Sequence, residues 1–198
     1  STANFPSQPD YYGLTDALYD HRVKGVNYTD HDEDIYVGYR YFDTFNKPVA
    51  YPFGYGLSYT TFSMSGFSAK ADGRQGVTVK VTVKNTGSRP GKQVAQVYVA
   101  SPKGGEEMPA KELKTFAKTR MLKPGESQTL TMSVPRRLLT SFDEAGSQWK
   151  GGAGNYTFMV GDNVEHILGK ATVKLGAYTE KVSDALKPQV KLNLLRKK

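Results

Sequence analysis

The sequence predicts an all-β fold, a β-sandwich preceded by an irregular, aromatic-rich N-terminal extension. From about residue 61 onwards, apolar residues recur at every second position, as they do in strands with one buried and one solvated face. Short runs rich in Gly, Pro and Asn separate these apolar runs. A helical period is convincing nowhere, and only residues 136–142 are expected to form a helical turn.

Seven strand candidates follow one another along this part of the chain. The five strongest runs are 77–83, 95–99, 130–134, 156–160 and 171–175, and two weaker runs are 62–69 and 113–120. Seven short strands over about 115 residues are typical of an immunoglobulin-like sandwich. Because the chain has no Cys, and therefore no disulfide of the immunoglobulin type, the pattern favours the fibronectin type III-like variety.

The first 60 residues differ from the rest in composition. Four prolines interrupt them, and only residues 35–42 have strand-like content. Of the 23 aromatic residues in the chain, 15 lie within residues 1–62. A packed aromatic side chain buries about 150–250 Å², so leaving this many rings in water would be costly. We therefore expect the segment either to wrap around the sandwich or to belong to a surface of a larger body.

Charge is divided between the same two regions. The 198-residue chain has a formal net charge of +8, but residues 1–62 carry 4 basic and 8 acidic side chains, against 23 and 11 in the remainder. The cations sit mostly at alternate strand positions, as Lys80 and Lys84 do around Thr82, which is typical of a solvated strand face. With no recognised binding motif beside them, we expect no nucleic-acid partner. No run approaches the roughly 20 apolar residues of a membrane span, and none is expected.

Residues for nucleophilic or metal chemistry form no recognisable site. The chain has three histidines and no Ser in a nucleophile-elbow motif, which argues against a catalytic triad. The run HDED at 31–34 is dense in metal-ligating groups, but successive residues of an extended chain point to opposite sides. A solvated acidic turn, or an ion-pair site for Arg22 or Arg40, is therefore expected there. We accordingly expect no metal and no cofactor.

A retaining glycosidase places two carboxylates about 5–5.5 Å apart. The chain contains enough carboxylates for such a pair, but nothing in the sequence places two of them face to face in a pocket. The candidates, each expected to be a solvated loop charge, are Glu33, Asp34, Asp43, Glu106, Glu107, Asp143 and Glu144. The single Trp149 lies beside a Gly-rich turn and could stack on a sugar ring or close the end of the sandwich core. We favour the second role because large aromatic residues mostly contribute burial.

Two segments of the extension are specific enough to resemble a known family. The runs EDIYVGYRYFD at 33–43 and YPFGYGLSYTTF at 51–62 resemble the C-terminal portion of glycoside hydrolase family 3, the family of many β-glucosidases and β-xylosidases. Downstream runs follow in the family's order, including VKVTVKNTG at 79–87, KELKTF at 111–116 and GNYTFMVG at 154–161. The resemblance covers roughly residues 27–170.

The resemblance implies a division into three parts. Residues 1–60 would be the end of the family's α/β sandwich domain and a linker, residues 61–178 its fibronectin type III-like β-sandwich, and residues 179–198 a basic tail. The family's Asp nucleophile and Glu acid/base lie upstream of the matching region, so neither catalytic role is assigned to any residue here. The chain is thus expected to be a fragment of a larger hydrolase, separated from its catalytic groups.

The resemblance also implies a function. The chain would be the accessory, structural and non-catalytic C-terminal segment of an enzyme that hydrolyses terminal β-glucosides with retention. Its partners would be the catalytic domains of the same parent chain, with carbohydrate as a further candidate, and its location extracytoplasmic, either periplasmic or secreted. Three alternatives stay open: a carbohydrate-binding module, a parent of the β-xylosidase type, and a complete small glycosidase.

On this reading the aromatic-rich extension is the junction between the catalytic domains and the sandwich. The residues expected to pack at this domain junction are Tyr39, Arg40, Tyr41, Asp43, Phe53, Gly54, Tyr55, Gly56 and Tyr59. Arg40 is expected to pair with Asp43 or Asp34 and so to fix the angle of the linker. The two glycines are expected to let the backbone pass close to neighbouring rings.

Overall fold

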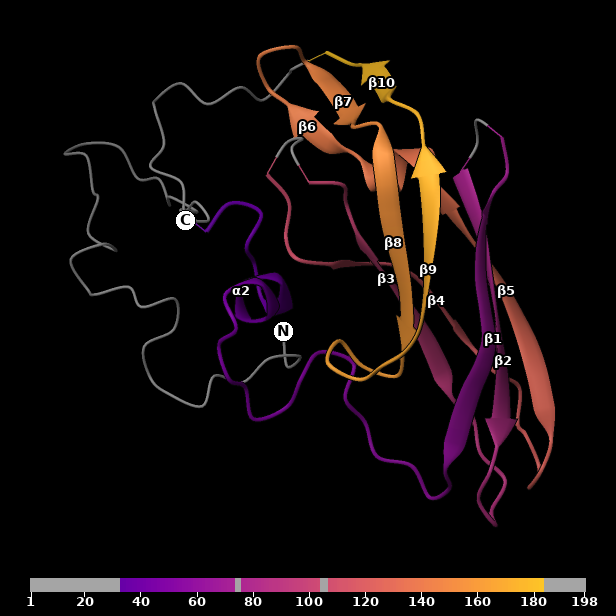
Figure 1. Cartoon of the computed structure of the whole chain (residues 1–198). Helices are drawn as coiled ribbons and strands as arrows, with labels where there is room; N and C mark the ends of the chain where they lie inside the picture. Colours follow the sequence, from indigo (N-terminus) through magenta and orange to yellow (C-terminus); the bar gives the residue numbers. More distant parts are fainter. Residues whose placement is uncertain (1–32, 74–75, 104–106, 184–198) are drawn as a thin grey trace.

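The computed structural model describes residues 33–73, 76–103 and 107–183, and two antiparallel sheets form its body (Figure 1). One sheet has the strand order β1-β2-β5 and the other has the order β4-β3-β8-β9. The seven strands are β1 (Phe62–Ala71), β2 (Gly76–Asn85), β3 (Val94–Ala100), β4 (Glu112–Lys118), β5 (Ser127–Pro135), β8 (Gly154–Gly161) and β9 (Ile167–Leu175). They confirm the predicted all-β sandwich.

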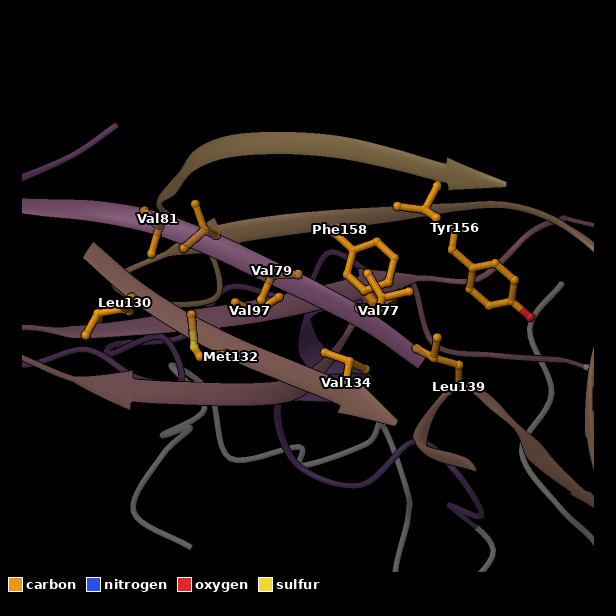
Figure 2. Close-up of a cluster of buried hydrophobic side chains, with 14 of the residues drawn as sticks. Val77, Val79, Val81, Val97, Leu130, Met132, Val134, Leu139, Tyr156 and Phe158 are labelled. Atoms are coloured by element: carbon orange, nitrogen blue, oxygen red, sulfur yellow. The ribbon is translucent and has the colours of Figure 1, made fainter. Parts of the chain in front are cut away.

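The core lies between the two sheets and is built from the alternating apolar residues (Figure 2). Val79 of β2 lies opposite Met132 of β5, and Val81 lies opposite Leu130, so the pleat places all four side chains on one face. Phe158 of β8, fully buried, meets them from the other sheet. The period of two in the sequence is therefore the pattern of burial in the structure.

A third, small sheet closes one end of the sandwich, and the sequence did not predict it. It has the order β10-β7-β6, with β6 (Ser141–Asp143), β7 (Gln148–Gly151) and β10 (Tyr178–Lys181). Strands of three or four residues are too short to show alternation. β10 runs past the boundary expected at residue 178. The helical turn expected within residues 136–142 is present as the 3-10 helix η2 (Arg136–Leu139).

The strand-like interpretation of residues 35–42 is wrong, because the chain there enters a short α-helix, α2 (Tyr39–Thr44). Gly38, at φ 60° and ψ −130°, turns the chain just before the helix. Tyr41 and Phe45 are four residues apart and meet on one side, with ring centroids 4.9 Å apart. Aromatic residues favour strands on average, but here their packing on a helical face prevails. No helix among the described residues is long and apolar enough to cross a membrane.

Candidate functional site

The linker segment, defined here as the described residues 33–60, covers the outer face of the four-stranded sheet. Figure 1 shows α2 on the side of this sheet that faces away from β1, β2 and β5. Tyr98 of β3 points to this outer side, yet it is 0% exposed. Its cluster contains Met159 and Val164 from the sandwich and Tyr39 and Phe53 from the linker segment. β3 is thus buried on both faces, by the core on one side and by the linker segment on the other.

Tyr39 anchors the start of α2 to the sheet. Its ring stacks on Phe53, with centroids 4.4 Å apart and planes 23° apart, and meets Tyr98 edge-on at 6.3 Å. Its hydroxyl accepts a hydrogen bond of 2.8 Å from the backbone N–H of Leu113. The pairing of β3 with β4 is irregular next to Leu113, since Val97 lies opposite Thr115 and Tyr98 opposite Leu113. Such a bulge leaves backbone groups without a hydrogen bond to the neighbouring strand, and Tyr39 of the linker segment binds one of them, the N–H of Leu113.

A second attachment holds the chain around Gly54. The side chain of Gln96 donates a hydrogen bond of 3.3 Å to the carbonyl of Gly54 and accepts one of 2.6 Å from the Tyr98 hydroxyl. The N–H of Val164 donates to the carbonyl of Phe53 at 2.9 Å. Burial raises the pKa of both the Tyr39 and the Tyr98 hydroxyls above its usual value, so both groups stay protonated at neutral pH.

We predict that Gly54→Ala destabilises the chain by about 1–3 kcal/mol, because Gly54 adopts a φ of +86° and an added Cβ would lie 2.2 Å from the Gln96 side chain. Gly56→Ala is the matched control, since a Cβ there meets nothing within 4 Å. The control should change the free energy of unfolding by less than about 0.5 kcal/mol. Urea denaturation of both variants measures the difference, and equal effects would contradict the role of Gly54.

Ion pairs add a third attachment, with partners that differ from those expected. Arg40 pairs with Glu112 of β4 at 3.0 Å, and Glu112 also pairs with Lys114 at 2.8 Å. The expectation that Arg40 would pair with Asp43 or Asp34 is therefore wrong. Asp43 instead pairs with Lys111, and both side chains are largely buried, so Asp43 is not the solvated loop charge that the sequence suggested. Long-range pairs of this kind depend on tertiary placement and leave no spacing signal in the sequence.

The far side of α2 has a small core of its own. Tyr41 is buried there together with Tyr36 and Phe42. The hydroxyl of Tyr36 donates a short hydrogen bond to Glu107 from the loop before β4. Glu107 was expected to be a solvated loop charge, and this contact shows that expectation to be wrong. The linker segment thus forms a compact unit that the sandwich holds at several points.

Three of the residues predicted at the junction lie away from the sandwich. Tyr55 is 48% exposed and Tyr59 is 92% exposed, and Gly56 has open space around it. Leu57 between them is 90% exposed, and the ring of Tyr51 lies 5.3 Å from that of Tyr55. A Cβ added at Gly54 would meet the Gln96 amide, and one added at Gly56 would meet nothing within 4 Å. We call Tyr51, Tyr55, Leu57 and Tyr59 the exposed linker strip.

A cleft of about 880 Å³ lies between the linker segment, the loop before β4 and the β6–β7 hairpin. The carboxylates on its walls are Asp34, Glu107, Glu112, Asp143 and Glu144. Glu107 and Glu112 are engaged as described above, and a hydrogen bond from Gln148 lowers the pKa of Asp143. A glycosidase needs a general acid whose pKa is raised, so Asp143 is not suited to that role. Within the described ranges no three metal-ligating side chains gather at one point, and His31, Asp32, Arg22 and Glu106 lie outside those ranges.

Trp149 lines this cleft, and its ring contacts two other side chains of the protein. The guanidinium of Arg137 lies over the ring at 4.2 Å from the centroid, and the ring of Phe142 contacts it at 5.3 Å. Stacking on a sugar requires an open ring face, and the Arg137 contact uses one face for a cation–π interaction. The arrangement supports a structural role for Trp149, but its contacts are with η2 and β6, and it is not one of the residues that form or pack against the sandwich core.

The sandwich side of the junction, above all Gln96, Tyr98 and Glu112, was not predicted. One signal was present: residues 94–100, VAQVYVA, carry large residues at both parities, which indicates a strand buried on both faces. A second was Glu112 between Lys111 and Lys114, a carboxylate placed among cations. Neither signal identifies the linker segment as the covering element.

Comparison with known proteins agrees with this architecture. A model of the fibronectin type III-like domain matches residues 93–164. The β-glucosidase of Ruminococcus albus is 44% identical over 159 residues, which are 77% of this chain and 17% of that enzyme. The exo-α-(1→6)-L-arabinopyranosidase of Bifidobacterium breve is 40% identical over 148 residues, which are 75% of this chain and 19% of that enzyme.

A solved structure shows the same fold at similar coverage. The crystal structure of the GH3 β-glucosidase of Bifidobacterium adolescentis superposes with a TM-score of 0.80 and 33% identity, over 93% of this chain and 27% of that one. This chain spans less than a fifth of the length of the two curated relatives above. It therefore belongs to glycoside hydrolase family 3, where it corresponds to the C-terminal portion of β-glucosidases, a fibronectin type III-like domain with the linker that precedes it.

Proposed function

We propose that this segment is a structural, non-catalytic accessory part of an enzyme that hydrolyses terminal β-glucosides with retention, and that it fixes the linker against the catalytic domains of that enzyme. The observation that carries the proposal is the division of the linker segment into two sides. Tyr39, Gly54 and Arg40 are bound to the sandwich. Tyr55, Leu57 and Tyr59 are presented to the outside.

Exposed apolar clusters of this kind mark interaction sites. In the proposed arrangement, the sandwich acts as a rigid base and the exposed linker strip packs on the catalytic body. The ion pairs and hydrogen bonds on the sandwich side would then set the angle at which the strip is presented. The predicted roles of Tyr55, Gly56 and Tyr59 at the domain junction belong to this proposal.

Sugar specificity is proposed to lie outside this segment. The relative from Ruminococcus albus is a β-glucosidase and the one from Bifidobacterium breve an exo-α-(1→6)-L-arabinopyranosidase, yet both share this segment at 40% identity or more. A structural segment that holds domains together is compatible with either activity. A parent of the β-xylosidase type therefore stays the alternative, and we propose a periplasmic or secreted location for the parent.

Hydrolysis of p-nitrophenyl β-glucoside and β-xyloside by the purified 198-residue chain tests the non-catalytic role. We expect a circular dichroism spectrum of a folded β protein and no turnover of either substrate. Turnover that disappears when one acidic residue of the chain is replaced would contradict the proposal, because it would place an active site within this segment.

The docking role has a separate test with the triple substitution Tyr55→Ser, Leu57→Ser and Tyr59→Ser. In the 198-residue chain these side chains are exposed, so the substitutions should change the free energy of unfolding by less than about 0.5 kcal/mol. In the complete enzyme the same substitutions should speed thermal inactivation severalfold, since they remove apolar area buried between domains. Met121→Ser, at a residue of the sandwich that is 52% exposed, is the control. Equal inactivation rates for the triple variant and the control would exclude docking through this strip.

A further inference from the structure

The outer face of the three-stranded sheet is a regular array of hydroxyl groups and lysines. Apart from Pro135 at the end of β5, twelve side chains point outward from β1, β2 and β5, and nine of them are Ser or Thr while three are Lys. We call this set the hydroxyl–lysine grid. Its members are Ser63, Ser65, Ser68, Lys70, Thr78, Lys80, Thr82, Lys84, Ser127, Thr129, Thr131 and Ser133.

The strand register arranges the grid in four rows of three residues. Lys84 of β2 lies between Ser63 of β1 and Ser127 of β5, and Lys80 lies between Ser68 and Thr131. The other two rows are centred on Thr82 and Thr78. Rows are spaced about 6.6 Å apart along the strands and columns about 4.8 Å apart across them.

A bulge in β1 keeps the array continuous. The register shifts between Ser65 and Ser68, and Gly66 adopts a φ of +60° at this point. The shift places the Phe67 side chain against the core, while Ser65 and Ser68 both face outward. Without the bulge, strict alternation would put one of the two serines on the core side.

Charge on the grid has one sign. Lys70, Lys80 and Lys84 are all exposed, and none of the twelve positions carries a carboxylate or an aromatic ring. The one carboxylate that the described contacts bring to the grid is Asp72, which accepts a hydrogen bond of 3.1 Å from Thr78 at one end. Lys80 and Lys84, four residues apart on one strand, are separated by about 13 Å along it.

We propose that the hydroxyl–lysine grid binds an extended acidic polysaccharide, one that carries uronate carboxylates. The lysines supply charge complementary to the carboxylates, and the hydroxyls donate and accept hydrogen bonds with the sugar hydroxyls between them. The four rows repeat along the strands, and a repeating array of contacts suits an extended polymer chain. The proposal is independent of the role of the linker segment, which lies on the opposite sheet.

Other partners fit the grid less well. Neutral sugars are commonly held by exposed aromatic rings, and the grid has none. Single-stranded nucleic acids are bound through stacking on aromatic residues, and Arg is favoured for bidentate contacts with phosphate. The grid contains no aromatic residue and no Arg. A partner must therefore bind to hydroxyl and ammonium groups.

Affinity electrophoresis of the 198-residue chain through gels containing polygalacturonate tests the proposal, with pullulan as the neutral polymer. We expect retardation by polygalacturonate, weakened by added salt, and none by pullulan. The double variant Lys80→Glu and Lys84→Glu should bind about tenfold more weakly, since it replaces two attractions by two repulsions. The variant Lys170→Glu and Lys174→Glu, with the same charge change and spacing on exposed positions of β9, is the matched control and should bind almost as the parent chain does.

Two results would overturn the proposal. Equal weakening in the two double variants would show that net charge, not the grid, determines retention. Tighter binding of a single-stranded oligonucleotide than of polygalacturonate at the same ionic strength would assign the face to nucleic acid.

Thr82→Val with Thr129→Val, which removes the hydroxyl pair at 2.9 Å and keeps every charge, should weaken binding severalfold. Unchanged binding in that variant would be a third contradicting result, because it would reject the role of the hydroxyls.

Discussion

Replacing Asn85 by Ala is expected to lower the free energy of unfolding by about 3–5 kcal/mol, a large effect for one polar side chain. Asn85 ends β2 and is 0% exposed. Its amide group donates to the carbonyls of Arg89 at 2.7 Å and Leu122 at 2.9 Å. Its side-chain oxygen accepts from the Thr60 hydroxyl at 2.8 Å and from the N–H of Gly87 at 3.0 Å.

These four hydrogen bonds join three separate segments: the end of the linker segment, the loop after β2 and the chain before β5. Alanine would remove all four hydrogen bonds. The Leu122 carbonyl would keep the bond that it accepts from the N–H of Gly91 at 3.0 Å, but the bond that it loses to Asn85 is buried. Each buried polar group left unsatisfied costs about 1–3 kcal/mol. The loss should appear as a lower urea midpoint with an unchanged slope, which indicates reduced stability rather than a changed denatured state.

Thr86→Ala is the matched control for this prediction. Thr86 is the next residue, and its hydroxyl makes an exposed contact of 3.0 Å with that of Thr61. The substitution should cost less than about 0.5 kcal/mol. If Asn85→Ala and Thr86→Ala lowered the midpoint equally, Asn85 would be only a turn residue.

The sandwich was predictable because its strands are long enough to repeat their pattern. β2 has Val at four alternate positions, and each of these residues lies in the core. The same reasoning fails for β6 and β7, which have three and four residues, and for the buried side chain of Asn85, whose sequence context indicates a turn. Alternation of apolar residues predicts which face of a strand is buried. It does not predict which loops a polar side chain at the end of the strand, such as that of Asn85, connects by hydrogen bonds.

The linker segment was predictable in composition but not in conformation. Its aromatic content and the resemblance to family 3 pointed to a packed junction, and Tyr39 and Phe53 do pack on the sheet. The partners of Arg40 and Asp43 could not be read from the sequence, because both ion pairs connect residues about 70 positions apart. The helix α2 was missed because six residues are too few to show a helical period.

Tyr39→Ala is expected to release the linker segment from the four-stranded sheet and to lower the free energy of unfolding by about 2–4 kcal/mol. The substitution removes the stack on Phe53 at 4.4 Å and leaves the N–H of Leu113 without its acceptor. It also uncovers the outer side of Tyr98, which the linker segment now shields from water. Tyr59→Ala is the control, since Tyr59 is 92% exposed and should contribute little.

Tyr39→Phe separates the two contributions, because it keeps the ring stack and removes only the hydroxyl that accepts from Leu113. It should cost about 1 kcal/mol, the price of one lost hydrogen bond at a partly buried site. Hydrogen exchange provides the local readout: Tyr39→Ala should lower protection at the N–H of Val164, which donates to Phe53, while protection within β2 falls only with global stability. Unchanged protection at Val164 would mean that Phe53 and Gln96 hold the linker segment without Tyr39. Because the same contacts present Tyr55 and Tyr59 to the outside, Tyr39→Ala in the complete enzyme should reproduce the faster inactivation expected of the exposed linker strip variant.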